Sequence, residues 1–302
     1  MRALLIMGPT ASGKSALGLR LAEAADGEIV NADSMQVYAD LRVLTARPSD
    51  ADLAAAPHHL YGHVDAGVRH SVGAWLKEAR NAIEAIRGRG KTPIVLGGTG
   101  LYFRALTEGL STAPAAPTAE LEARLATEGA PALHAALAAA DGAAAARIAP
   151  NDGPRLIRAL SVLEATGRTL SSFPMSPPLA DWVGLALWPE RGALYAAIEA
   201  RFDAMIATGA LDEVRALAPR GLDPGLPAMK AHGAPALMAH LRGDMRLEEA
   251  AALGKRDTRR YAKRQFTWMA HQLSGWTRAA AADLAGRARE GHALLKGAAQ
   301  RQ

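Results

Sequence analysis

The chain has 302 residues, a formal net charge of +5 and no cysteine. Without cysteine it can hold no disulfide, no thiolate nucleophile and no cysteine-ligated zinc. No apolar run approaches the ~20 residues needed to span a bilayer, and the short N-terminal run does not resemble a signal peptide. We therefore expect a cytoplasmic protein with no membrane partner, and the positive charge permits a nucleic-acid partner.

The first feature along the chain is a glycine-rich loop that fits the pattern of two glycines followed by Lys and Ser. The apolar run 3–7 before it predicts a buried strand, and the spacing of apolar residues in 16–22 predicts a helix. Such a strand, loop and helix direct backbone N–H groups at an anion. We expect the Ser15 hydroxyl to bind Mg²⁺, the expected cofactor. The predicted diphosphate- or nucleotide-binding residues are Gly8, Pro9, Thr10, Ala11, Ser12, Gly13, Lys14 and Ser15.

Further segments predict the rest of a parallel sheet. Residues 27–33 and 92–96 are apolar enough for strands, and a helix with Ser71 as its N-cap runs between them to about Arg87. A last strand candidate lies at 182–188. Alternating strands and helices predict a parallel sheet with crossover helices. Because the carboxyl ends of its strands form the ligand crevice, we expect Asp33 to face the phosphate loop.

Between two proline-rich segments, only helical patterns occur, at 118–127 and 153–166. We therefore predict an α/β core over 1–114, a helical insertion over 115–180, and a return to the core with basic helices over 181–302. The predicted fold class is α/β, a P-loop NTPase-like parallel sheet with an inserted all-helical domain and a helical C-terminal region.

A late segment, 255–265, carries six basic residues against one acid. On a helix, three of them share one face: Arg256, Arg260 and Lys263. Basic groups follow phosphates and aromatic rings stack on bases, so Tyr261 and Trp268 make single-stranded or looped RNA a candidate partner. The alternative is a solvated basic face with both aromatic rings packed in the core.

Two absences narrow the chemistry. Strand 92–96 is followed by Gly-Gly-Thr and no carboxylate, unlike the strand that holds Mg²⁺ in nucleotide hydrolases. This pattern favours a small-molecule kinase or an alkyl transferase over a motor or switch GTPase. The adjacent His58 and His59 point apart on most backbones and no third ligand is spaced to help them, so we interpret them as structural.

Taken together, the motifs resemble the tRNA dimethylallyltransferase family, also called tRNA isopentenyltransferases, as far as about Gln272. The segments that carry this resemblance are 8–15, 33–38, 57–60, 97–102, 151–158, 167–168 and 261–268. It implies transfer of a dimethylallyl group from its diphosphate to N6 of the adenine on the 3′ side of the anticodon. It also implies a helical insertion that closes over an anticodon stem-loop, and we expect a monomer. The chain departs from the family pattern at Leu44, Arg47, near 121 and at 230–235, which puts tRNA contacts near 121 and 230–235 in doubt.

The resemblance further implies roles for single residues. Asp33 would be the general base for the adenine amine, Thr99 would donate to the diphosphate, and Arg201 would clamp it. The loop, with Lys14 and Mg²⁺ on Ser15, would neutralise the leaving diphosphate. The implied tRNA contacts are Asp33, Ser34, Met35, Gln36, Pro154, Arg155, Leu156, Ile157, Arg158, Arg256, Arg260, Lys263, Arg264 and Gln265.

Three alternatives remain open at this stage. A P-loop small-molecule kinase would use ATP in the same loop, with Asp33 as base for a hydroxyl acceptor. A non-catalytic RNA-binding protein would keep a vestigial loop and would bind tRNA with steep salt dependence. Alkylation of free AMP is disfavoured, because a nucleotide acceptor needs neither of the two basic helices.

Overall fold

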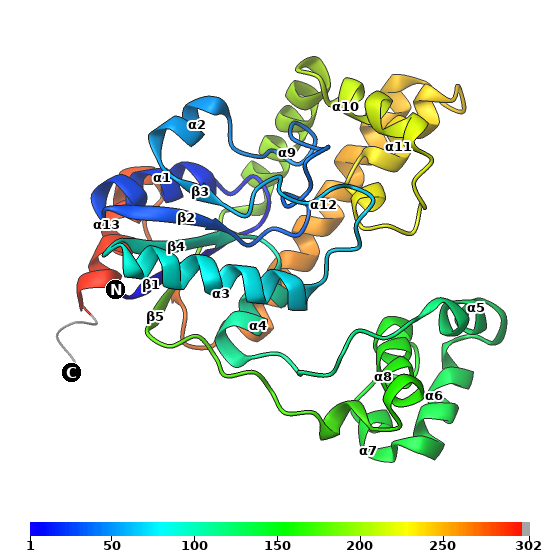
Figure 1. Cartoon of the computed structure of the whole chain (residues 1–302). Helices are drawn as coiled ribbons and strands as arrows, with labels where there is room; N and C mark the ends of the chain where they lie inside the picture. Colours follow the sequence, from blue (N-terminus) through cyan, green and yellow to red (C-terminus); the bar gives the residue numbers. More distant parts are fainter. Residues whose placement is uncertain (298–302) are drawn as a thin grey trace. The chain divides into compact units, whose positions relative to one another are not determined.

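The computed structural model describes residues 1–297, and the chain divides into two compact units. One unit joins Met1–Thr107 with the chain from Leu179 onward, and the other is Glu108–Pro178. Figure 1 shows the second unit as the helices α5 to α8. It begins earlier than the predicted boundary at 115. Among the described residues, no helix combines the length and the apolar character that crossing a membrane requires.

The first unit is built on a six-stranded sheet in the order β3-β2-β4-β1-β5-β6, in which every pairing is parallel. Its strands are β1 (Ala3–Met7), β2 (Gly27–Asn31), β3 (His58–His59), β4 (Thr92–Gly97), β5 (Trp182–Ala186) and β6 (Thr277–Arg278). All of β1, β2 and β4 is buried, as expected for strands covered on both faces. The predicted α/β fold with a parallel sheet is confirmed, and the two-residue strands β3 and β6 lie outside the predicted ones.

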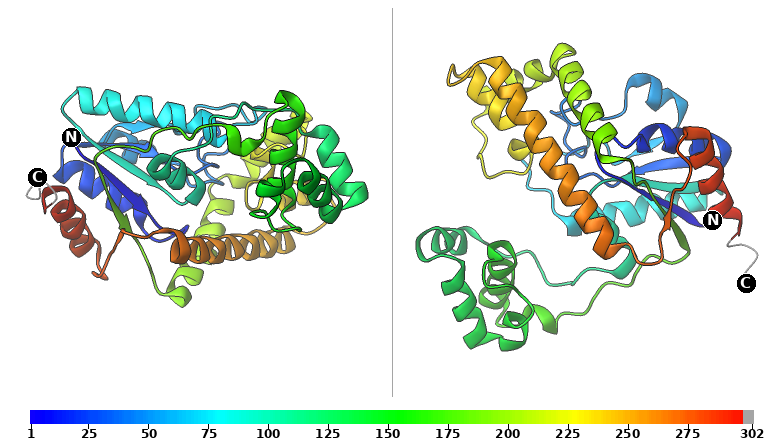
Figure 2. Two further views of the ribbon diagram at one scale, coloured as in Figure 1. Left: turned by 90° about the horizontal axis from the view of Figure 1, so that it is seen from below. Right: turned by 180° about the vertical axis from the view of Figure 1, so that it is seen from behind.

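Helices cover both faces of this sheet. Figure 2 (left) shows the strands between α3 (Val72–Gly88) on one side and α13 (Leu284–Gly297) on the other. On the α13 side, side chains from that helix and from α1 (Lys14–Ala24) pack on alternate strand residues such as Leu4 and Ile6. The predicted N-cap of α3 is confirmed, because Ser71 Oγ accepts a hydrogen bond from Ala74 N–H.

A second group of helices packs at the carboxyl end of the sheet. It comprises α4 (Gly100–Glu108), α9 (Arg191–Ala207), α10 (Ala210–Leu217), α11 (Ala234–Leu241) and α12 (Leu247–Gln272). The short helix α2 (Asp50–Ala55) instead leads directly into β3. The long helix α12, orange in Figure 2 (right), packs closely on α9. A Cβ at Gly254 of α12 would lie 2.1 Å from the Phe202 ring of α9, so only glycine permits this close packing.

The second unit has an apolar core of its own. Its helices are α5 (Ala119–Glu128), α6 (Ala130–Ala140), α7 (Gly142–Ala145) and α8 (Gly153–Thr166). Leu121, Leu133, Leu137 and Leu156 meet in its centre. Helix α8 is capped by Asp152 at its start and ends at Gly167, whose φ of 66° is the left-handed conformation that glycine adopts without strain. These caps explain why the predicted helix 153–166 has the same bounds in the structure.

Candidate functional site

The glycine-rich loop between β1 and α1 has the backbone of an anion-binding turn. Ala11 and Gly13 have φ values of 62° and 83°, the left-handed conformation that occurs in anion-binding turns. No side chain caps the start of α1, so no side-chain hydrogen bond occupies the N–H groups of its first turn. The Ser12 hydroxyl is buried and has no hydrogen-bond partner in the described part of the chain. A ligand with several anionic oxygens would satisfy these donors.

Asp33 follows β2 at the carboxyl end of the sheet, and its backbone is fixed by Asn31. The Asn31 side chain accepts a hydrogen bond from Asp33 N–H at 2.8 Å and donates to the Asp33 carbonyl at 3.0 Å. Met35 N–H donates to Asp33 Oδ1 at 2.9 Å, whereas Oδ2 takes no part in these bonds. One carboxylate oxygen is therefore held by the backbone, and Asp33 as a residue lines the cavity described below.

Thr99 lies beside this segment because β4 is the neighbour of β2. Its N–H donates to the carbonyl of Ala32 at 3.2 Å, and its Oγ1 accepts a hydrogen bond from Ser34 N–H at 3.0 Å. The Thr99 hydroxyl also contacts Ser34 Oγ at 3.3 Å. The sheet thus places two of the three predicted catalytic residues, Asp33 and Thr99, on adjacent strand ends.

Arg201, the third, comes from helix α9, and its Nη2 donates to the Thr10 hydroxyl of the phosphate loop. Lys14 Nζ donates to the carbonyl of Pro9 at 3.1 Å. Burial lowers the pKa of Lys14 to about 8, Asp33 acts against this shift, and Arg201 adds to it. Burial also lowers the pKa of Arg201, again opposed by Asp33. Asp33 therefore lies close enough to Lys14 and Arg201 to act on the pKa of both cations.

A cavity that is partly open to solvent lies beside these groups. Its polar lining residues are Thr10, Asp33, Thr45, Arg201, His232 and Thr258, and its other lining residues are Met35, Leu44, Ile198, Phe202, Met205, Ala231 and Tyr261. Placed charges on one part of the lining and apolar side chains on the other suit a ligand with an anionic head and a hydrocarbon tail.

His232 is a cavity residue that sequence reasoning missed. Its ring lies 4.6 Å from the Tyr261 ring, and burial lowers the pKa of His232. The segment 230–235 departs from the family pattern, so no motif pointed to His232. Leu44, another departure, also lines the cavity. The apolar wall could not be predicted because its members come from four separate parts of the chain.

Gln265 of α12 bridges the phosphate loop and the end of β4. Its Oε1 accepts a hydrogen bond from Thr10 N–H at 3.0 Å, and its Nε2 donates to the Gly98 carbonyl at 2.9 Å. The residue is 4% exposed. Its amide is therefore used inside the protein, and we narrow its predicted role from tRNA contact to positioning of the loop.

We expect the substitution Gln265→Met to destabilise the protein by about 1–3 kcal/mol, because it leaves Thr10 N–H and the Gly98 carbonyl buried without partners. Affinity for a diphosphate ligand should fall with it, since Thr10 belongs to the loop. Urea unfolding and calorimetric titration would measure both effects. The matched control is Gln272→Met on the exposed face of the same helix. An unchanged diphosphate affinity would argue against the positioning role.

Helix α12 presents one basic surface, which consists of Arg256, Arg260, Lys263 and Arg264, all exposed. Within this surface Arg256 and Arg260 pair with Asp257 of the same helix, at 3.1 and 3.9 Å. The other two basic side chains of the segment pair with helix α9, Lys255 with Asp203 and Arg259 with Glu199. Trp268 packs on Gly100, where a Cβ would lie 2.3 Å from the indole, and Tyr261 lines the cavity. Trp268 is thus packed within the protein, as the alternative interpretation expects, whereas Tyr261 borders the cavity.

The other predicted tRNA contacts differ in accessibility. In α8, Pro154 and Arg155 are exposed, whereas Leu156 and Ile157 are buried in the core of their unit and their side chains cannot reach a ligand in this structure. Arg158 donates to the carbonyls of Ala113 and Pro114 at 2.9 Å, which connects α8 to the segment that precedes α5. We therefore narrow the proposed contacts in this helix to its first two exposed residues.

The segment after Asp33 is held by its own loop. The Gln36 side-chain amide donates to the carbonyls of Thr45 and Ala46 at 2.9 and 2.8 Å. Met35 lines the cavity. Of the two adjacent histidines, His58 contacts the Ala56 carbonyl through Nδ1 and His59 pairs with Glu28. These contacts agree with a structural role for the histidine pair.

Comparison with known proteins covers almost the whole chain. The model of a family described as IPP transferase matches residues 36–272, and one described as isopentenyl transferase matches residues 1–62. A protein of Bradyrhizobium sp. (strain BTAi1) named tRNA dimethylallyltransferase is 59% identical over 280 residues, which is 90% of this chain and 92% of that protein. One of the same name from Rhodopseudomonas palustris is 57% identical over 291 residues, or 93% of this chain and 91% of its own.

Two solved structures are also similar to most of this chain. A tRNA isopentenylpyrophosphate transferase from Bacillus halodurans is 35% identical, with a TM-score of 0.71 and coverage of 98% of this chain and 96% of its own. A eukaryotic dimethylallyltransferase acting on tRNA, known from crystallographic snapshots, is 30% identical, with a TM-score of 0.76 and coverage of 88% and 69%.

Proposed function

The chain belongs to the tRNA dimethylallyltransferase family of IPP transferases, and on that premise we propose the reaction in detail. The dimethylallyl group leaves its diphosphate and is joined to N6 of the adenine on the 3′ side of the anticodon in tRNA. The observation that carries this proposal is the cavity in which Asp33 and Arg201 meet an apolar wall beside the phosphate loop.

Asp33 acts as general base in this proposal. The lone pair of the adenine amine is delocalised into the ring, so the amine is a poor nucleophile and must lose a proton as the new bond forms. The N6–carbon bond forms, the carbon–oxygen bond to diphosphate breaks, and the N6 proton goes to Asp33. The carboxylate is oriented for this by the hydrogen bond from Met35 N–H to Oδ1, which leaves Oδ2 for the proton.

The phosphate loop and two cations hold the diphosphate. Lys14, Arg201 and the buried Ser12 hydroxyl supply charge and donors, and Thr99 lies beside them at the end of β4. Ser15 fits a role as Mg²⁺ ligand, because its hydroxyl is exposed in the first turn of α1 and Mg²⁺ prefers oxygen donors completed by phosphates and water. When bound, Mg²⁺ would neutralise charge that develops on the leaving diphosphate.

The apolar part of the cavity protects the hydrocarbon tail. Phe202, Met205 and Leu44 keep water away from the allylic carbon, whose cation-like transition state water would otherwise capture. The basic surface of α12 and the start of α8 are the proposed tRNA contacts. They supply positive charge for the phosphate backbone of the anticodon stem-loop.

The substitution of both Arg260 and Lys263 by Ala should weaken tRNA binding and lower the slope of log K against log salt by about 1 for each phosphate that these side chains neutralise. Both side chains are exposed, so the fold should be unaffected. Filter binding from low to moderate salt would measure the slope. Arg215→Ala with Arg242→Ala, on exposed positions of other helices, is the matched control. A variant that binds tRNA as tightly as wild type does would show that this basic surface is a solvated face and does not contact tRNA.

The proposed function is tested by a transfer assay with labelled dimethylallyl diphosphate, Mg²⁺ and unmodified tRNA. We expect label in the adenine beside the anticodon. Consumption of ATP on a small acceptor without tRNA would favour the kinase alternative. Binding of tRNA without any product would favour a non-catalytic RNA-binding protein.

A further inference from the structure

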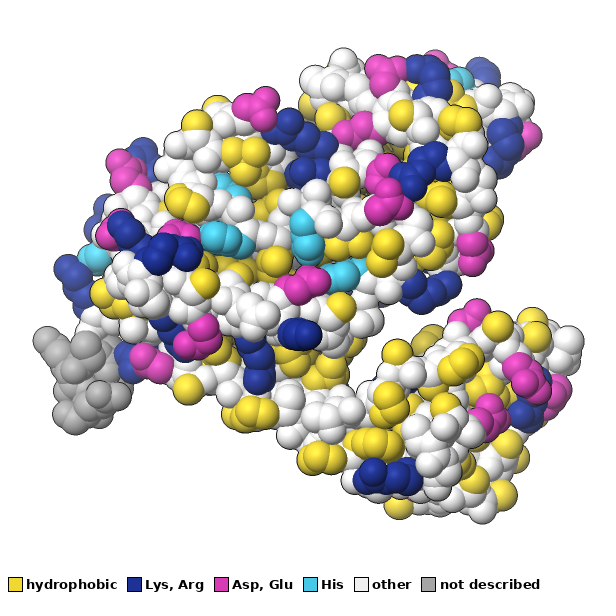
Figure 3. All heavy atoms as spheres, viewed as in Figure 1, with side chains coloured by type: hydrophobic (Ala, Val, Ile, Leu, Met, Phe, Trp, Pro, Cys, Tyr) yellow, Lys and Arg dark blue, Asp and Glu magenta, His cyan; other side chains and the backbone are white. Residues whose placement is uncertain are grey.

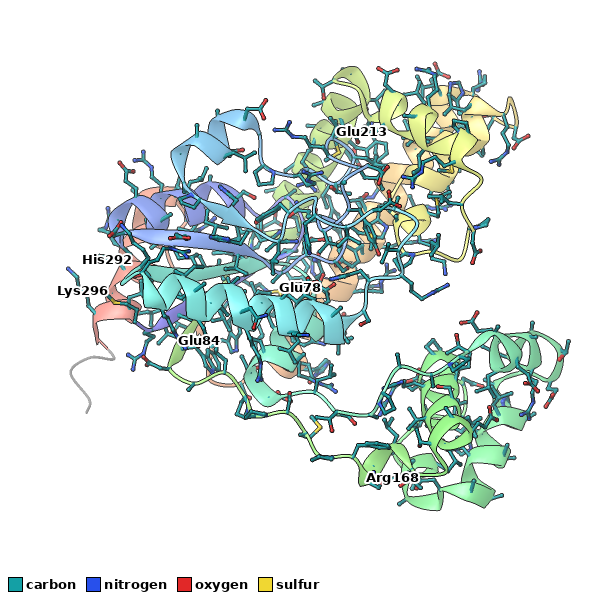
Figure 4. All side chains as sticks on the ribbon, viewed as in Figure 1. Glu78, Glu84, Arg168, Glu213, His292 and Lys296 are labelled. Atoms are coloured by element: carbon teal, nitrogen blue, oxygen red, sulfur yellow. The ribbon has the colours of Figure 1, made fainter. Side chains whose placement is uncertain are left out.

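Among the described residues, one cluster of metal-ligating side chains lies outside the cavity: His63, His70 and Glu78. The Nε2 atoms of His63 and His70 lie 3.0 and 3.1 Å from the same carboxylate oxygen of Glu78. One ligand atom from each residue lies within 4.8 Å of the others. Figure 3 shows two histidine side chains beside an acidic one over α3, and Figure 4 labels Glu78 on that helix.

We propose that these three side chains bind one Zn²⁺ ion, with water as the fourth ligand. Two imidazoles and a carboxylate are a donor set that zinc accepts in four-coordinate sites, whereas Mg²⁺ prefers oxygen donors alone. In a tetrahedral site with bonds of ~2.0–2.2 Å, neighbouring ligand atoms lie about 3.3 Å apart. The two spacings between a histidine nitrogen and the Glu78 oxygen, 3.0 and 3.1 Å, are close to that value, and all three ligand atoms lie within 4.8 Å of one another. The exposure of His63 leaves room for the water.

The backbone holds the ligands in place before any ion binds. The neighbours of His63, Gly62 and Val64, donate backbone hydrogen bonds of 2.9 and 3.0 Å to the loop that follows β2. His70 immediately precedes the helix cap Ser71, and its side chain is only 6% exposed. The two imidazole rings are nearly perpendicular, with centroids 5.7 Å apart. Because the three side chains are already held in place, little conformational entropy is lost when the ion binds, which favours affinity for the ion.

The protonation of the rings sets a limit on that affinity. Without an ion, each Nε2 hydrogen-bonds to Glu78, so a neutral ring carries its proton there. Binding to zinc requires Nε2 to be unprotonated, and the proton then resides on Nδ1. Nδ1 of His70 is buried and has no partner within the described part of the chain. Leaving a buried N–H unpaired is unfavourable, so we expect micromolar and not nanomolar affinity.

The ion would connect the segment that follows β3 to helix α3, and its effect is separate from the transfer reaction. The full chain should be titrated with ZnCl₂ in the presence of excess Mg²⁺, which occupies sites that have only oxygen ligands. We expect a stoichiometry of one zinc ion per chain. Cobalt in place of zinc should give the visible absorption of a four-coordinate site. Added zinc should also raise the melting temperature, because it binds only the folded arrangement.

His63→Ala and Glu78→Gln should each weaken zinc binding by roughly 100-fold and abolish both the cobalt absorption and the rise in melting temperature. Both side chains are partly exposed, so these variants should fold, which their melting temperatures without zinc will verify. The matched control is His271→Ala on an exposed position of α12. The proposal is overturned if wild type binds no zinc, if either cluster variant binds it as wild type does, or if His271→Ala alone abolishes binding.

Discussion

The substitution Asp33→Asn should lower the rate of dimethylallyl transfer by about 10³-fold and change tRNA affinity by no more than a few fold. Asn keeps an oxygen that can accept the hydrogen bond from Met35 N–H, so the backbone conformation should persist. It cannot take up the N6 proton, and removal of a positioned general base costs about 10²–10⁴-fold in rate. Single-turnover transfer with labelled dimethylallyl diphosphate measures the effect.

The pH of that experiment matters because Asp33 also acts on Lys14. Its charge counteracts the burial that lowers the pKa of Lys14, so the variant should hold Lys14 less firmly protonated. Rates should therefore be compared at about pH 6.5, well below the Lys14 pKa of about 8 in wild type. Asp50→Asn, at an exposed acid of α2, is the control for loss of a negative charge. Turnover near the wild-type rate would remove Asp33 from the role of base.

The substitution Lys14→Ala should lower kcat/KM for dimethylallyl diphosphate by about 10²–10³-fold, since it removes a cation from the leaving group in a partly buried site. The loss should appear in the binding of inorganic diphosphate as well, measured by calorimetry without tRNA. A variant that binds diphosphate as wild type does would show that Arg201 and the loop backbone are sufficient.

The lowered pKa of Lys14 also predicts the pH dependence of diphosphate binding. In the free protein the amine is charged below about pH 8 and loses its proton above it. Because an anion binds the charged form, wild-type affinity should fall as pH rises through 8, by no more than tenfold per pH unit. Lys14→Arg keeps its charge throughout this range, so its affinity should stay level. Parallel curves for the two proteins would contradict this assignment.

The sequence predicted the sheet well because its strands carry long apolar runs next to turn residues. The predicted strands at 3–7 and 92–96 and the helix at 153–166 agree with the structure almost residue for residue. β3 and β6 were missed because two residues are too few to show a period. Asp33 could be placed at a strand end from the rule for parallel sheets alone.

The composition of the cavity wall could not be predicted in the same way. Ile198 and Phe202 lie on one helix, but His232 comes from an irregular segment and Tyr261 from another helix. Their meeting depends on tertiary packing, for which local patterns give no signal. Gln265 shows the opposite error, because a polar residue in a basic helix suggested a surface role while its amide is buried between two backbone groups.

The position of Gln265 has a consequence for how two ligands influence each other. It lies on the same rigid helix as the basic surface, one residue from Arg264, and its amide holds the loop proposed to bind diphosphate. If a bound polyanion displaced α12, the displacement would reach the loop through this amide, and thermodynamic reciprocity would make the effect on affinity equal in both directions. The binding of diphosphate and the binding of tRNA would then each change the affinity for the other ligand through the side chain of Gln265.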